Sequence, residues 1–522
     1  MGDYLKAFEK HSEYETYSSG DMLKPNVSYC VDNNEVHYNP WTWADTYLTF
    51  VAKEAGAISF NILSSMGTDK IESISYSTDN GSTWTTTNNQ NDKEDNLEIT
   101  VNVTTGDTIL WKGTATQTGY FDEDDYFYFG SFFSSSCEFD AKGNVMSLLY
   151  GDNFKGKVDL TGKNCTFNNL FAGNSKLVSA ENLSLPATTL ANNCYRSMFE
   201  GCTSLATAPE LPATTLASDC YDNMFYDCTL LATAPSILPA TTLANNCCYG
   251  MFAGCTALTA APVLPATTLA SYCYTSMFRD CTSLTTAPVL PATTLADSCY
   301  GGMFRGCTSL TTAPELPATT LEDGCYSAMF EGCTALTTAP ELPATTLING
   351  CYSAMFNGCT ALTTAPELPA TTLEDSCYSN MFNGCTALTT APELPATTLA
   401  SYCYSYMFQD CTLLTTAPVL PATTLASYCY TSMFRDCTSL TTAPVLPATT
   451  LTRGCYGSMF YGCSSLNSIK AMFTTTPSMD YTDSWVSGVA STGTFIKNTA
   501  ATWNVTGANG IPTGWTVNTA SA

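Results

Sequence analysis

A 26-residue pattern recurs eleven times between Cys194 and Leu466, and it constrains the fold more than any other feature of the 522-residue chain. Each copy reads Cys-Tyr-x-x-Met-Phe-x-(Gly/Asp)-Cys-(Thr/Ser)-x-Leu-x-x-Ala-Pro-x-Leu-Pro-Ala-Thr-Thr-Leu-x-x-x, with few departures. A degenerate copy precedes them, with Leu170-Phe171 in place of Met-Phe and Asn174 in place of the second cysteine. Repeats of about 20 to 50 residues bury their hydrophobic faces by stacking on one another. The sequence therefore predicts a solenoid.

The residues of one copy predict a short helix followed by an extended return. Cys273, Met277 and Cys281 are spaced i, i+4 and i+8, which would place them on one face of a helix. The segment from Leu284 to Ala287 predicts a short parallel strand, because the prolines that follow cannot donate hydrogen bonds to a sheet. The predicted fold class is therefore an α+β repeat solenoid with 26-residue coils, each containing a short helix and a short parallel strand.

The repeat resembles that of a known family. The core Met-Phe-x-Gly-Cys-Thr-x-Leu, followed by Leu-Pro, is similar to the BspA-like leucine-rich repeat of bacterial surface proteins, which usually reads Ala-Phe-x-Gly-Cys-x-x-Leu with Ile-Pro. The resemblance covers residues 165–466 and implies a leucine-rich-repeat-like solenoid. The first cysteine position is usually Ile in that family, which implies that both cysteine columns lie in the core.

Two columns of positions hold 22 of the 26 cysteines. Helical positions eight residues apart would be separated by about 12 Å, which exceeds the span of about 7 Å that a disulfide allows. Zinc sites usually have ligands two to four residues apart, often including His, and no His occurs in the repeats. We therefore predict reduced, buried thiols and no metal site.

The first part of the chain, residues 1–41, is predicted to be an extended leader that serves as an attachment arm. The run from Lys24 to Pro40 resembles leader segments of virion-associated proteins from phages of gut anaerobes. The first eleven residues contain no apolar stretch of the length that a secretory signal requires. The leader is therefore expected to join the chain to a virion structural protein.

Three further regions flank the repeats. Residues 42–150 alternate between apolar and polar side chains and contain turn signals, which predict a β-sandwich. Within it, Ser77 to Trp84 matches the Asp-box hairpin of sialidases, a structural turn in those families, and Asp122 to Asp125 either bind calcium or form a solvated turn. Residues 151–193 are predicted to be an N-terminal cap with the degenerate repeat, and residues 467–522 a β-rich C-terminal cap.

Composition excludes several classes of function. The chain has 46 Asp and Glu against 19 Lys and Arg, a net charge of −27, and such a field repels the phosphates of nucleic acid. No run approaches the roughly 18 apolar residues of a membrane helix, so we expect no membrane insertion. Both histidines lie in the leader and no Gly-rich phosphate loop occurs. We therefore predict that the protein is not an enzyme and has no catalytic or cofactor-binding residue.

Differences between the copies concentrate at positions that a solenoid exposes. We predict that tyrosines at such positions bind a ligand, because tyrosine buries area at a low entropic cost; they are Tyr272, Tyr402, Tyr406 and Tyr428. A second set of tyrosines follows the first cysteine of nearly every copy. That set either forms a recognition column or packs between coils, and the sequence leaves both possibilities open.

Two hypotheses for function follow. The first is a phage virion appendage, a fibre or decoration protein, whose solenoid binds a glycan or protein of the bacterial host surface. The alternative is an extracellular adhesin of the BspA-like family on a bacterial cell surface. The ligand and the oligomeric state, including a homo-oligomer, stay open.

Overall fold

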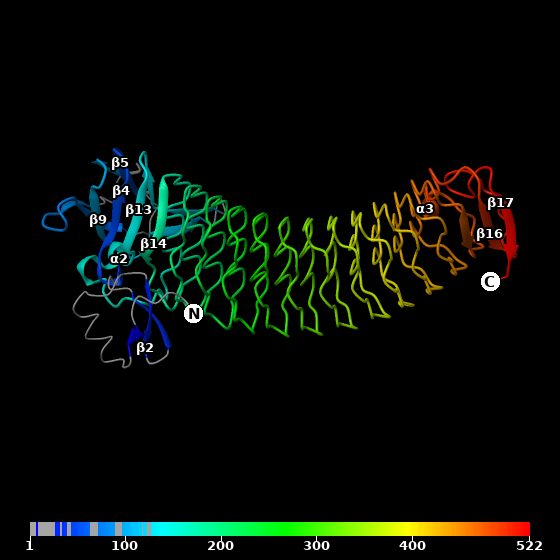
Figure 1. The fold of residues 1–522 in the computed structure, drawn as a ribbon, viewed down its shortest axis with the longest axis horizontal. Helices are drawn as coiled ribbons and strands as arrows, with labels where there is room; N and C mark the ends of the chain where they lie inside the picture. Colours follow the sequence, from blue (N-terminus) through cyan, green and yellow to red (C-terminus); the bar gives the residue numbers. More distant parts are fainter. Residues whose placement is uncertain are drawn as a thin grey trace.

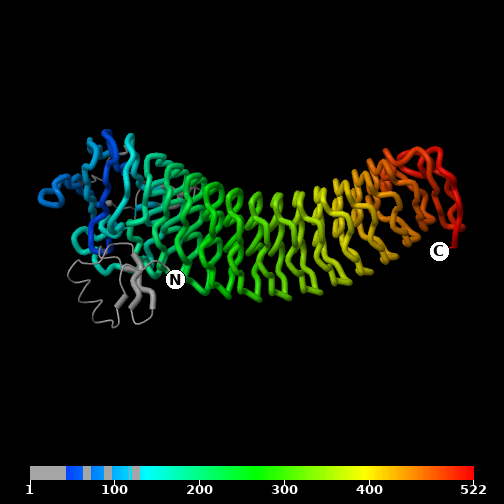
Figure 2. Tube along the Cα trace, in the orientation of Figure 1, coloured from blue at the N-terminus to red at the C-terminus, as the bar shows by residue number. Residues whose placement is uncertain are grey.

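The computed structural model describes residues 7–8, 27–31, 34–38, 43–62, 71–88, 97–116, 118–122 and 127–521. They form an elongated, curved rod with β-sheets at its N-terminal end and a small sheet at its C-terminal end (Figure 1). The trace passes along the rod from coil to coil, so each repeat lies between its two neighbours in the sequence (Figure 2). One cluster of buried apolar side chains extends from Leu48 to Trp515.

The predicted short helix is wrong, because each coil contains a ribbon of overlapping turns instead. In the coil of Cys325, φ is positive at Gly324 (57°), Ala328 (53°) and Gly332 (73°), whereas φ is negative throughout an α-helix. No α-helix occurs in residues 194–466, all of which the structure describes. The prediction failed because a backbone conformation that repeats every four residues also places positions i, i+4 and i+8 on one face.

Alternate amides of the turn ribbon have different partners. The amide of Met329 donates to the carbonyl of Tyr326 in its own coil (3.3 Å), and the amide of Phe330 donates to the carbonyl of Met355 in the next coil (2.9 Å). The same alternation continues through the ribbon, with Gly332 donating to Asn357 of the next coil (2.7 Å). Half of the ribbon amides therefore hold adjacent coils together.

The return segment of each coil is extended and meets its neighbours at single residues. Thr312 forms parallel bridges with Thr286 and Thr338, and a second column of bridges joins Thr294 to Thr268 and Thr320. Thr286 lies in the predicted strand, so the parallel pairing is present but is one residue long in each coil. Two prolines lie between the two bridges of each coil, as Pro288 and Pro291 do between Thr286 and Thr294. They prevent longer ladders there, because they lack the N–H donor.

Equivalent side chains stack in columns inside the rod. The phenylalanines of the repeat, from Phe171 to Phe460, have ring centroids 5.2–5.8 Å apart and nearly parallel planes. The tyrosine after the first cysteine forms a second column of buried rings, as at Tyr326 and Tyr352 (5.9 Å). This result decides the alternative left open by the sequence, because these tyrosines pack between coils.

The thiol of the second cysteine forms an additional bond between coils. Cys281 Sγ donates to the carbonyl of Phe252 (3.1 Å), and the same bond recurs along the rod at 2.9–3.1 Å. Thiols of the first column reach a carbonyl oxygen only at 3.9–4.0 Å, as for Cys273. The second column is therefore a ladder of S–H donors, and the first is apolar packing.

Two sheets pack face to face at the N-terminal end. One has the strand order β14-β13-β4-β9-β6-β7 and the other the order β12-β5-β8. Phe133 of the smaller sheet contacts Phe50 (4.7 Å) and Trp111 (5.2 Å) of the larger. The strands are β4 (Leu48–Ala52), β5 (Gly56–Ile62), β6 (Ile71–Ser77), β7 (Thr85–Asn88), β8 (Leu97–Val103), β9 (Thr108–Ala115), β12 (Phe132–Ser135), β13 (Phe139–Asn144) and β14 (Leu177–Ser184).

Strand β14 joins these sheets to the rod. It pairs in parallel with β13, and its Ser179 forms a parallel bridge with Thr207 of the next coil. Between β13 and β14 lie two short helices, α2 (Ser147–Tyr150) and η2 (Gly151–Asn153). The larger sheet therefore continues directly into the stacked coils.

The C-terminal end continues the stack rather than forming a separate unit. Strands β15 (Ser468–Ala471), β16 (Thr494–Asn498) and β17 (Thr516–Ala520) form a parallel sheet. Ser468 of β15 pairs with Thr494 of β16, one repeat length later. A single turn of helix, α3 (Met479–Thr482), lies between β15 and β16. The residues predicted as a β-rich cap thus form divergent coils, and the repeat spacing is lost at the next step, where Thr494 of β16 pairs with Thr516 of β17.

Most of the predicted leader lies outside the described residues. The parts that are described form a small sheet of β1 (Ala7–Phe8), β2 (Val27–Val31) and β3 (Asn34–Tyr38), in which β2 and β3 form a hairpin. Its attachment role stays a prediction. The possible calcium ligands also lie largely outside, because residues 123–126 are not described between β10 (Gly119–Asp122) and β11 (Phe127–Gly130).

The two cysteine columns should respond differently to serine. Cys281→Ser retains a donor for the carbonyl of Phe252 and should lower the free energy of unfolding by about 1 kcal/mol or less. Cys273→Ser buries a hydroxyl without a nearby acceptor and should cost about 1–3 kcal/mol. Urea unfolding of the full chain measures both, with the wild type as control. Equal costs would contradict the assignment of S–H donors to the second column.

Candidate functional site

The cysteines are structural rather than reactive. The 25 cysteines whose side chains the structure describes are all free and buried. Burial raises the pKa of the Cys351 thiol to about 11 and that of Cys194 to about 12, which suppresses the nucleophilic thiolate near neutral pH. Among the described residues, no group of three or more His, Cys, Asp or Glu side chains could hold a metal ion.

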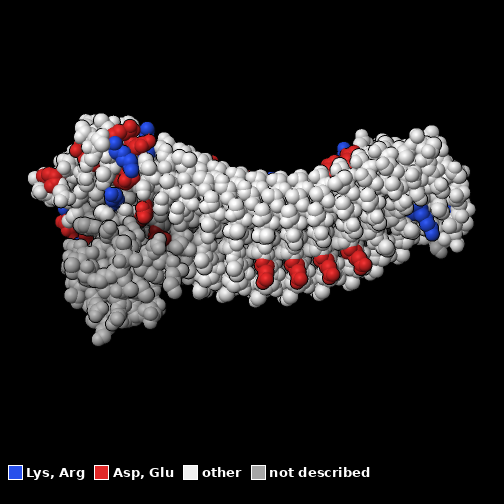
Figure 3. All heavy atoms as spheres, in the orientation of Figure 1, with Lys and Arg blue, Asp and Glu red and all other residues white. Residues whose placement is uncertain are grey.

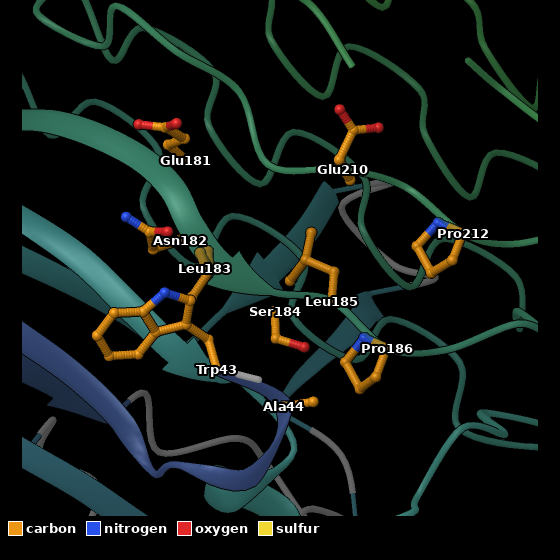
Figure 4. Close-up of a pocket in the computed structure, with 10 residues that line it drawn as sticks. All are labelled: Trp43, Ala44, Glu181, Asn182, Leu183, Ser184, Leu185, Pro186, Glu210 and Pro212. Atoms are coloured by element: carbon orange, nitrogen blue, oxygen red, sulfur yellow. The ribbon is translucent and has the colours of Figure 1, made fainter. Parts of the chain in front are cut away.

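A pocket of about 310 Å³ lies where the N-terminal sheets meet the first coils (Figure 4). Its wall includes the indole of Trp43 and the carboxylates of Glu181 and Glu210. Glu210 is already engaged, because the amide and hydroxyl of Ser236 donate to its carboxylate. The residues that line the pocket contain no Cys, His or Lys. Its polar side chains are those of Asn182, Ser184 and the two glutamates.

The hairpin from Ser77 to Trp84 is held together by its own hydrogen bonds. Thr83 donates its amide (2.8 Å) and its hydroxyl (2.7 Å) to the carboxylate of Asp79, and Ser77 donates its hydroxyl to the same group (2.7 Å). These bonds lower the pKa of Asp79 to about 2. The carboxylate is used to close a turn, which agrees with a structural role for this motif.

The predicted ligand-binding tyrosines lie on one edge of the turn ribbon. Tyr272 and Tyr402 directly precede the first cysteine of their coils and are 46% and 43% exposed, respectively. Tyr428 occupies the same position in the last but one of the eleven copies, and Tyr406 occupies the next left-handed position of its coil; both are half-buried. The structure therefore places all four on the surface, in contrast to the buried tyrosines that follow the cysteine.

Two of the four tyrosines form a stack. The rings of Tyr402 and Tyr428 are 4.8 Å apart and nearly parallel (4°), and the guanidinium of Arg453 lies 5.8 Å from the centre of the Tyr428 ring. Tyr272 lies five coils away from this stack, because its coil begins at Cys273 and that of Tyr402 at Cys403. The four tyrosines are thus not one compact site.

These tyrosines have an unfavourable backbone conformation. The φ angles of Tyr272, Tyr402, Tyr406 and Tyr428 lie between 57° and 59°, in the left-handed region that bulky residues rarely adopt. At the position before the first cysteine, other coils have Gly, Asn, Asp or Ser, which tolerate this region better. Tyrosine at these positions costs about 1–2 kcal/mol of backbone free energy, so folding alone does not account for it.

Acidic side chains form a row along the rod on the face that Figure 3 shows. Four successive coils have an exposed glutamate between Pro and Leu, at Glu315, Glu341, Glu367 and Glu393. A second acidic set lies on the edge of the tyrosines: Asp297, Glu322, Asp323, Glu374 and Asp375, all exposed. The sequence shows that residues change at these positions, but the grouping was missed. The available signal was position within the repeat, because these acids lie two or three residues before the first cysteine and Tyr272 and Tyr402 lie one residue before it.

Comparison with protein families gives one match. The family described as BspA type leucine rich repeat region matches residues 168–311, 276–391, 303–441 and 351–481, which together span more than half of the chain. The chain therefore belongs to the BspA-type leucine-rich repeat family, as the resemblance of its repeats implies. Such repeats indicate a repeat protein of the surface-adhesin type. Comparison with curated proteins and with solved structures gave no match.

The family match does not extend to the ends of the chain. It begins at residue 168, so it includes none of residues 1–41, and nothing found supports their resemblance to virion proteins. Among the described residues, no helix has both the length and the apolar character needed to cross a membrane.

Burial of the thiols should make the rod sensitive to alkaline pH. The pKa of Cys351 rises from 9.0 to about 11 on folding, so the unfolded chain releases this proton at lower pH than the folded chain. Stability should therefore be full below pH 9 and fall as the pH rises toward 11. Urea midpoints across this range measure the effect.

Thiol labelling at about pH 8 should be slow for the folded chain and approach all 26 thiols after denaturation. Rapid labelling of the folded chain would contradict burial.

Removing an exposed tyrosine should not harm the fold. Tyr272→Gly relieves the left-handed strain and should leave the free energy of unfolding within about 0.5 kcal/mol of wild type. Tyr272→Val retains the strain in a β-branched residue and should be less stable than Tyr272→Gly by about 1–2 kcal/mol. Tyr274→Gly, two residues away in the buried column, serves as the control and should cost more than about 3 kcal/mol. A large loss for Tyr272→Gly would show that this ring stabilises the fold.

Proposed function

We propose that the protein is a non-enzymatic, adhesin-type binding protein that is displayed outside the cell and contacts its partner along the edge that carries Tyr272, Tyr402, Tyr406 and Tyr428. One observation carries this proposal: the surface stack of exposed Tyr402 on half-buried Tyr428 lies at left-handed positions where tyrosine is costly. Residues held in unfavourable backbone conformations cluster at functional sites. Tyrosine is also a frequent contact residue in recognition surfaces.

The geometry of the rod supports binding rather than catalysis. The stacked coils present one long edge on which outward positions differ from coil to coil while the core positions recur. The thiols of the described cysteines are buried, so they are not available as surface nucleophiles. An extended surface of this kind suits a large partner such as a surface protein or glycan.

The virion hypothesis depends on a part of the chain that is mostly not described. Attachment to a virion protein would use residues 1–41, which the family match does not include. The placement on a bacterial cell surface rests instead on the repeats themselves. We therefore favour the adhesin, and the virion role stays a prediction.

Binding of the labelled full chain to intact bacterial and animal cells tests the proposal. We expect saturable binding that falls at least about fivefold in affinity for the double variant Tyr402→Gly/Tyr428→Gly, because both rings of the stack are lost. Leu413→Ala is the matched control, since Leu413 is 51% exposed in the coil of Tyr402 but lies outside the edge that carries the four tyrosines. Absence of saturable binding, or equal loss in the control, would refute the proposal.

A further inference from the structure

The edge that carries Tyr272, Tyr402, Tyr406 and Tyr428 is called the tyrosine edge. Its section between Tyr272 and Tyr402 is acidic. We name this section the acidic edge: Asp297, Glu322, Asp323, Glu374 and Asp375, with Tyr272 and Tyr402 at its ends. Backbone hydrogen bonds connect it from coil to coil, from Tyr272 to Asp297 (2.9 Å), Ser298 to Asp323 (2.8 Å), Gly324 to Asn349 (3.0 Å), Gly350 to Asp375 (2.9 Å) and Ser376 to Ser401 (2.9 Å). Asp297, Asp323 and Asp375 therefore occupy equivalent positions in one column, in which Asn349 replaces the acid of the middle coil. Glu322 and Glu374 directly precede two of these aspartates.

The spacing of the coils sets the length of the acidic edge. Tyr272 and Tyr402 are five repeats apart, and coils joined by parallel bridges are separated by about 4.8 Å. The edge is therefore roughly 25 Å long. This length matches about seven or eight residues of an extended polypeptide, at about 3.3 Å per residue.

Each terminal tyrosine lies one coil away from a carboxylate. Asp375 accepts a hydrogen bond from the amide of Ser401, the residue before Tyr402 (2.8 Å), and the carbonyl of Asp297 accepts one from Tyr272. The equivalent residues in the adjacent acidic coils are Ser298 and Ser376, which are too small to cover a phenol ring. An exposed ring beside a carboxylate attracts a cation through both the π face and the charge.

The charges of this part of the rod are not balanced within the chain. Residues 306–434 contain ten Asp and Glu and no Lys or Arg. The neighbouring arginines are held by other carboxylates, Arg279 by Asp280 (3.5 Å) and Arg305 by Glu331 (3.2 Å). Like charges in adjacent coils repel one another, so the acidic edge is stabilised by any cationic partner that neutralises it.

We propose that the acidic edge binds an extended, arginine- or lysine-rich segment of a partner polypeptide, with two of its cationic side chains over the rings of Tyr272 and Tyr402. This inference rests on the proposed function and names the partner of the same edge. Charge complementarity favours a basic partner. The edge offers equivalent positions in successive coils, which an extended chain can follow. The terminal tyrosines define where the basic segment begins and ends.

A fluorescent octapeptide of alternating Arg and Ser, titrated against the full chain and followed by anisotropy, tests the proposal. We expect saturable binding that weakens about tenfold or more between about 50 and 300 mM NaCl, since exposed charges are screened by salt. The same peptide with Glu in place of Arg should not bind. Absence of binding by the Arg peptide at low salt would overturn the proposal.

Matched variants separate this edge from the general negative field. Asp297→Asn/Asp323→Asn/Asp375→Asn should weaken peptide binding about tenfold, whereas Glu315→Gln/Glu341→Gln/Glu367→Gln removes the same charge from the other column and should change it less than about twofold. Tyr272→Gly/Tyr402→Gly should weaken it about threefold or more and should remain folded, because Gly suits both backbone positions. Equal losses in the two triple variants would overturn the assignment to this edge.

Failure of this inference can be told apart from failure of the proposed function. If cells bind the protein through the tyrosine stack but the Arg peptide does not compete, the adhesin role stands and the basic partner is wrong. The same holds if cells treated with protease retain full binding, because the partner is then not a polypeptide. If cells do not bind the protein at all, the proposed function itself fails.

Discussion

The hydrogen bonds between coils are the constraint on which the rest of the structure depends. Every second amide of the turn ribbon donates to the next coil, as Phe330 does to Met355, and the left-handed residue at every fourth position makes this alternation possible. An α-helix would use all its amides internally and leave the coils joined only by side chains. Burial of the Phe and Tyr columns, and the exposure of fixed positions between them, follow from this backbone.

The sequence was sufficient for the period, the core positions and the order of the coils. Cys273, Met277 and Cys281 lie in the core as their spacing predicts, although the backbone between them is not helical. The sequence could not distinguish a helix from the turn ribbon. Over so short a segment, the four-residue period of the ribbon and the 3.6-residue period of a helix place the same residues in the core. The Gly, Asn, Asp and Ser residues at every fourth position were the available signal for left-handed backbone.

For a related reason, only part of the candidate site could be predicted from the sequence. The exposed tyrosines could be identified because they vary between copies, but their strain depends on φ, which no pattern of apolar residues reveals. The stacking of Tyr402 on Tyr428 depends on adjacent coils having the same residue at the same place. The acidic edge likewise exists only when six coils are aligned, and it involves residues as far apart as Tyr272 and Tyr402.

Side chains at the left-handed positions also give the stack a direction. A β-carbon added at Gly306 would lie 2.2 Å from the carboxylate of Asp280, and one at Gly454 would lie 2.2 Å from the ring of Tyr428. A large side chain therefore leans toward the following coil and favours a small residue there, so adjacent coils are not interchangeable. Two large residues can follow one another only when their shapes are compatible, as in the parallel rings of Tyr402 and Tyr428. Rearranging whole coils would therefore preserve the core but disrupt the edge, which makes the edge the part of the rod where the order of the repeats carries information.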